Sequence, residues 1–113
     1  MNGHIKESDW KVFRSIHEIA LNRFCERILT EVQQTAAADG SKSPHEKYLQ
    51  VFKLIEERDD EMARAFSDFR RSTASLQLGI IYSLGVLTEE ELMRFSPETQ
   101  ALVKALFEIR NGR

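Results

Sequence analysis

The feature that most constrains the fold of this chain is a regular spacing of apolar side chains between residues 48 and 80. Ten positions in this stretch are separated alternately by four and three residues, and eight of the ten are apolar. The positions are Tyr48, Phe52, Ile55, Asp59, Met62, Phe66, Phe69, Thr73, Leu76 and Ile80. This spacing puts side chains on one face of an α-helix, so it predicts a long amphipathic helix.

Local start and stop signals divide the chain into segments. Ser43 before Pro44, with Glu46 three residues after the serine, is a typical helix start, and Ser96 before Pro97 is another. We predict helices over residues 9–37, 44–72, 74–86, 89–95 and 97–110. An unbroken helix from 44 to 86 would be about 64 Å long, and a compact domain of this size has a radius of gyration of about 13 Å. We therefore expect a break at residues 72–75 or at Gly79, or else a protruding helix that packs against a second copy.

These helices predict an all-α fold, an antiparallel helical bundle built on a long helical hairpin. Two or three shorter C-terminal helices would cover one end of the hairpin. A chain of 113 residues is close to the usual size of one domain. We expect a flexible N-terminus over residues 1–8 and a single helical domain over 9–113.

Composition argues against several classes of protein. A net charge of −2 is unusual for a nucleic-acid-binding domain. A lone cysteine, Cys25, cannot form an internal disulfide, and residues 1–8 contain no apolar segment typical of a signal peptide, so we expect a cytoplasmic protein. Residues 72–88 carry no charge, but their Ser, Thr and Gln content argues against a membrane span.

Acidic residues on the second predicted helix are candidate metal ligands. Glu56, Asp59 and Asp60 share a helix face and offer the oxygen ligands that magnesium prefers, and His17 is a further candidate. A solvated helix face explains the acidic residues more simply, and a packing role explains His17. Because Asp59 lies on the apolar seam, we expect it to pair with Arg23 or Arg27 on the first helix. We predict no cofactor and no catalytic residue.

Apolar side chains outnumber the sites that one small monomer can bury. We therefore predict a homodimer that associates through residues 66–87. The candidate interface residues are Phe66, Phe69, Leu76, Ile80 and Leu84. The leading hypothesis is a small cytosolic protein-interaction module without catalytic activity. The alternative is a small helical enzyme or ligand-binding bundle with a carboxylate-lined site, with or without a divalent metal, around Asp59 and Asp60.

Overall fold

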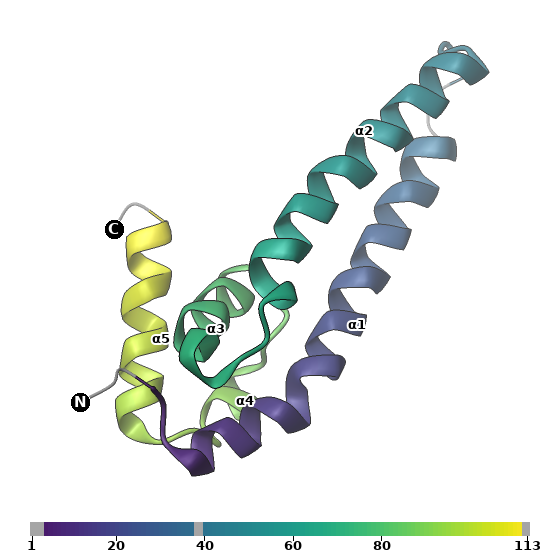
Figure 1. Ribbon diagram of the computed structural model, residues 1–113. Coiled ribbons are helices and arrows are strands. Elements are labelled where there is room, and N and C mark those ends of the chain that lie inside the picture. Colours follow the sequence, from purple (N-terminus) through teal and green to yellow (C-terminus); the bar gives the residue numbers. More distant parts are fainter. Residues whose placement is uncertain (1–3, 38–39, 112–113) are drawn as a thin grey trace.

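Helices account for almost all of the regular structure of this chain (Figure 1). The computed structural model describes residues 4–37 and 40–111. Within these ranges the chain forms five α-helices and no strand, which confirms the predicted all-α class. The helices are α1 (Glu7–Ala37), α2 (Pro44–Met62), α3 (Ala74–Ser83), α4 (Glu89–Leu92) and α5 (Pro97–Arg110). A π-helical turn (Ala63–Ser67) and a 3₁₀ turn (Arg71–Thr73) lie between α2 and α3.

Helices α1 and α2 form the predicted antiparallel hairpin, and its far end projects away from the other helices (Figure 1). The start of α2 is as predicted, because the Ser43 hydroxyl accepts the Glu46 N–H at 3.1 Å and the Glu46 carboxylate accepts the Ser43 N–H at 2.8 Å. The chain measures 56 × 29 × 24 Å and has a radius of gyration of 16.8 Å. A compact chain of this length would have a radius of about 13 Å. We call the projecting part, which is α2 with residues 21–37 of α1, the arm.

The second helix ends earlier than the predicted residue 72. Its α-helical part stops at Met62, the π-helical turn follows, and the backbone leaves helical geometry at Asp68. The Asp68 carboxylate accepts two hydrogen bonds from the Arg70 guanidinium at 2.7 and 2.8 Å. The Asp68 carbonyl accepts one from the Thr73 hydroxyl. These side-chain contacts compete with continued helix, so the break lies before the predicted 72–75 segment.

Two further helices are shorter than predicted, whereas α5 has the predicted bounds. Helix α3 ends at Ser83 because Gly85 adopts a left-handed backbone conformation with φ of 78°. This conformation terminates a helix, and glycine adopts it without steric cost. Helix α4 ends at Leu92, and a capping box formed by Thr88 and Glu91 marks its start. Two of the three C-terminal helices are therefore only one to three turns long.

The core lies between the first two-thirds of α1 and the C-terminal helices. Its members come from every part of the chain except α2: Phe13, Ile16, Ala20, Phe24, Phe66, Leu78, Ile81, Leu92 and Val103 are all buried. Helix α5 approaches α3 closely at Gly79, where an added Cβ would lie 2.8 Å from the Cβ of Leu106. The charge-free segment that sequence reasoning assigned to an interface is therefore largely enclosed by the chain's own helices.

The five predicted interface residues differ in how far this packing covers them. Phe66 and Ile80 are buried in the core, and Phe69 and Leu84 are half-buried against it. Of the five predicted interface residues, only Leu76 is well exposed, with a relative exposure of 57%. The surplus of apolar side chains exists, but it lies elsewhere in the molecule.

Part of the N-terminal segment that we expected to be flexible packs on the core. Residues 1–3 lie outside the described part, but Ile5 is buried and its carbonyl accepts a hydrogen bond from Arg71 at 2.8 Å. Asp9 is 2% exposed, and its carboxylate accepts the Ser96 N–H, the Ser96 hydroxyl and the Thr99 hydroxyl, each at 2.7 Å. A carboxylate on α1 thus caps the start of α5 from outside that helix.

Candidate interaction surface

Helix α2 is supported on one side only. None of its nineteen residues, all of which the structure describes, is buried. Its half-buried residues face α1, and we call them the inward set: Lys47, Val51, Leu54, Arg58, Glu61 and Met62. They recur every three or four residues, so they form one line along the helix. The remaining circumference of α2 is exposed.

Three members of the inward set are each followed directly by a large exposed apolar residue. These are Tyr48, Phe52 and Ile55, which are 63%, 51% and 46% exposed. Consecutive residues are about 100° apart around a helix, so the three share a face roughly a quarter turn away from α1. Leu49 is exposed beside them, and the Tyr48 and Phe52 rings stack with centroids 6.4 Å apart. We call Tyr48, Leu49, Phe52 and Ile55 the arm stripe.

Three members of the arm stripe, Tyr48, Phe52 and Ile55, begin the predicted seam, and the orientation of this face differs from the prediction. Periodicity alone places the whole line on one helix face, but only its later members, such as Phe66, join the core. The π-helical turn changes the number of residues per turn after Met62. The two halves of the seam therefore meet different surroundings.

An ion pair holds the observed register of the hairpin. The Arg58 guanidinium donates to both carboxylate oxygens of Glu31 on α1, at 2.9 and 3.1 Å, and lies 3.6 Å from Glu61. The hydrogen bond from Arg58 lowers the pKa of Glu31. Both side chains are partly shielded from water, and the fork geometry of arginine suits two parallel hydrogen bonds. This pair turns Arg58 toward α1 and leaves Asp59, the next residue, facing outward.

The predicted pairing of Asp59 with Arg23 or Arg27 is therefore wrong. Arg23 donates to both carboxylate oxygens of Glu91 at 2.7 and 2.8 Å, and this contact lowers the pKa of Glu91. Arg27 donates to the carbonyl oxygen of Leu84 at the end of α3. Both arginines therefore bind the C-terminal part of the chain rather than Asp59.

Contacts of α1 show which side of the arm is open. Ile28 is buried, Leu29 after it is exposed, and Arg27 before it binds α3. In two antiparallel helices, residues that follow an inward-facing residue lie on the same side of the pair, and residues that precede one lie on the other. Leu29 therefore shares a side with the arm stripe, whereas α3 to α5 lie on the opposite side. None of the described C-terminal helices covers the stripe.

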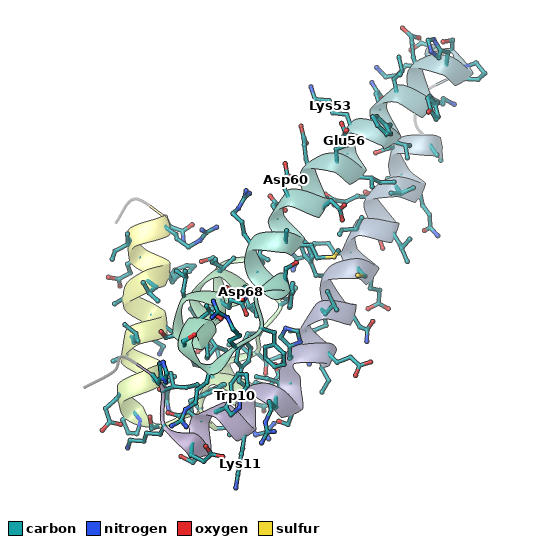
Figure 2. The ribbon with its side chains drawn as sticks, viewed as in Figure 1. Trp10, Lys11, Lys53, Glu56, Asp60 and Asp68 are labelled. Carbon is teal, nitrogen blue, oxygen red and sulfur yellow. The ribbon has the colours of Figure 1, made fainter. Side chains whose placement is uncertain are left out.

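The acidic candidates lie on the outside of α2. Glu56 and Asp60 point away from α1 beside Lys53 (Figure 2), and Glu56, Asp59 and Asp60 are all exposed. With Lys53 and Glu57 they line an open depression of about 490 Å³. No group of three or more His, Cys, Asp or Glu side chains in the described residues is arranged to hold a metal ion.

His17 lies in an aromatic cluster rather than beside these carboxylates. Its ring stacks on Phe69 with centroids 3.7 Å apart and meets the edges of Phe13 and Phe66. Burial lowers its pKa below the usual 6.5, although a hydrogen bond with the Phe66 backbone acts in the other direction. The buried Nε2 atom has no hydrogen-bond partner among the described residues. His17 is thus a packing residue, as the simpler interpretation held.

Comparison with known proteins leaves this geometry as the only basis for a functional argument. No family model, curated protein or solved structure matches this chain. Among the described residues, no helix combines the length and apolar character needed to cross a bilayer. The largest unexplained feature of the molecule is therefore the arm, whose open side carries Leu29 and the four side chains of the arm stripe.

Sequence reasoning missed this surface for an identifiable reason. The seam contains Tyr48, Phe52 and Ile55, but a second line through Val51, Leu54 and Arg58 lies one residue behind it. Both lines have helical spacing, and the prediction rests on the longer and more apolar one. The signal that could have chosen between them is Arg58, since it pairs with Glu31 on the neighbouring helix.

Proposed function

We propose that this chain is a non-catalytic protein-interaction module that forms a homodimer through the arm stripe. The observation that carries the proposal is an arm in which α2 buries no residue while Tyr48, Leu49, Phe52 and Ile55 stand exposed on one side. Contiguous exposed apolar side chains on a projecting element are typical of surfaces that bind protein. A cytoplasmic location stays a prediction.

The spacing of the stripe suits a helical partner. Its members follow the four-three pattern of helix–helix seams, and α2 is about 28 Å long. A helix of this length gains most of its stability from packing, and α1 supplies most of that packing here. A second arm laid against the stripe would cover the side chains that the monomer leaves in water.

The alternative, a carboxylate-lined site around Asp59 and Asp60, has weaker support. The depression there is wide and exposed, and His17 is absent from it. Enzyme sites usually enclose their ligands between apolar walls with few polar groups. We therefore favour the interaction module over an enzyme or ligand-binding bundle.

Sedimentation velocity on purified protein tests the proposal. We expect a species of twice the 13.1 kDa chain mass at tens of micromolar protein. Phe52→Glu should shift the chain to monomer, since it puts a charge in the centre of the stripe. The matched control is Leu76→Glu, which introduces the same charge at an exposed apolar residue of α3.

The two variants separate the two candidate interfaces. If Leu76→Glu dissociates the dimer and Phe52→Glu does not, the interface lies in the 66–87 segment and the arm stripe is not the docking surface. A wild-type chain that stays monomeric at this concentration contradicts the proposed function. Far-UV circular dichroism should be unchanged in both variants, because both side chains lie outside the core.

A further inference from the structure

The charges along α2 and the turn before it are divided between its two ends. Outside the inward set, residues 42–53 carry two lysines and one glutamate, a net charge of +1, and residues 56–61 carry four carboxylates, a net charge of −4. Lys53, Glu56 and Asp60 project from the outer side of α2, clear of α1 (Figure 2). Tyr48, Leu49 and Phe52 of the arm stripe lie within the basic region, and Ile55 directly precedes the acidic one.

This charge pattern is complementary to itself in one orientation only. When two copies of α2 lie parallel, the acidic halves face each other and repel. When they lie antiparallel, each basic half faces an acidic half. Charges arranged in this way select orientation and register more than they add affinity.

We infer that the partner of the arm stripe is a second copy of this chain whose α2 runs antiparallel to the first. The inference rests on the proposed function and adds the orientation of the partner. A two-fold axis near Phe52 makes the interface isologous, so the same residues contribute from both copies. The two arms then form a four-helix bundle, and the C-terminal helices lie on its outer sides because they occupy the opposite face of each arm.

The axis near Phe52 predicts which residues face each other. His45 lies seven residues before Phe52 and Asp59 seven residues after it, and seven residues bring a helix back to nearly the same face. Both side chains are exposed. In the antiparallel dimer His45 of one copy lies beside Asp59 of the other, whereas the two copies of His45 are about 21 Å apart.

Disulfide cross-linking of the full chain tests the orientation. The variants are His45→Cys and Asp59→Cys, each with the native thiol removed by Cys25→Ser, and one carries a tag so that the products differ in mass. We expect a mixed disulfide when the two are oxidised together, and little homodisulfide from either one alone. A disulfide requires Cα atoms within about 7 Å, so pairs 21 Å apart cannot form it.

The outcomes distinguish the orientation from the proposed function. Homodisulfides from each single variant, with the dimer intact in sedimentation, overturn the antiparallel arrangement and leave the interaction module standing. An absence of all cross-links from a chain that sediments as a dimer also overturns it. A monomeric chain instead overturns the proposed function. Raising the salt concentration should weaken the antiparallel dimer, whereas it would strengthen a parallel one.

Discussion

Removal of the Asp9 carboxylate should destabilise this protein more than any other single change of a charged side chain. Asp9 is 2% exposed and accepts three hydrogen bonds of 2.7 Å, two from Ser96 and one from Thr99. These bonds join the first turn of α1 to the first turn of α5, 87 or more residues along the chain. The perturbation therefore acts on a contact that closes the fold.

The size of the effect follows from the three bonds. A hydrogen bond to a charged group contributes about 1.5–3 kcal/mol, and a buried donor left without a partner costs about 1–3 kcal/mol. Because the bonds share one carboxylate, their contributions are not additive. We expect Asp9→Ala to lower the free energy of unfolding by about 3–5 kcal/mol. Domains of this kind have about 5–15 kcal/mol in total, so the loss is a large fraction.

Urea unfolding followed by circular dichroism measures this loss. Asp9→Asn keeps one acceptor oxygen and the shape of the side chain, so it should cost less than Asp9→Ala and should still fold. Glu18→Gln, at an exposed position of α1, is the matched control and should change stability by less than about 0.5 kcal/mol. A cost below about 1 kcal/mol for Asp9→Ala would refute the reasoning.

The pH dependence of the same variants gives an independent check. Burial raises the pKa of Asp9, but the hydrogen bonds from Ser96 and Thr99 outweigh burial, and the pKa lies below its usual value of 3.8. A lowered pKa means that the unfolded chain binds the proton first as the pH falls. The contribution of Asp9 is therefore complete above pH 3.8 and is lost as the pH falls below it toward the folded-state pKa. The stability difference between wild type and Asp9→Asn should narrow in that window.

Two further predictions concern the core. Gly79→Ala should lower the free energy of unfolding in urea by about 1–3 kcal/mol, because the new Cβ would lie 2.8 Å from Leu106 Cβ. Gly40→Ala is the control, since nothing lies within 4 Å of a Cβ there. Equal losses of stability in both variants would contradict the close approach of α3 and α5. His17→Phe should flatten the loss of stability on acidification below pH 6.5, because burial lowers the pKa of His17 and the unfolded chain therefore takes up the proton first. An unchanged pH profile in thermal melts would show that this ring does not titrate in the way its packing implies.

Cap chemistry explains which boundaries could be read from the sequence. Ser43 and Ser96, each followed by proline, mark the starts of α2 and α5, and the structure has both where they were expected. A cap acts within one turn of a helix, so its residues are neighbours in the sequence. The break at Asp68 lies several residues before the predicted one, although its contacts with Arg70 and Thr73 are equally local.

The candidate site shows the opposite case. Tyr48, Phe52 and Ile55 were recognised as one helix face, but whether that face is covered depends on how α1, α3 and α5 are placed around it. Phe66 and Ile80 belong to the same line in sequence and are buried, because the chain breaks between Met62 and Ala74 and folds back on α1. A one-dimensional pattern contains no information about that fold-back.

The sequence by itself determined that this protein is helical and where α2 and α5 begin. It also indicated more apolar side chains than one small monomer can bury. Those properties depend on neighbours within one or two turns of a helix. Only the tertiary structure decided that α2 projects and that Arg58 rather than Asp59 faces α1. It also decided that five of the ten large exposed apolar side chains of the described residues lie on the arm. The physical reason is that burial results from contacts between residues far apart in the chain, and several pairings of these helices satisfy the same periodicity.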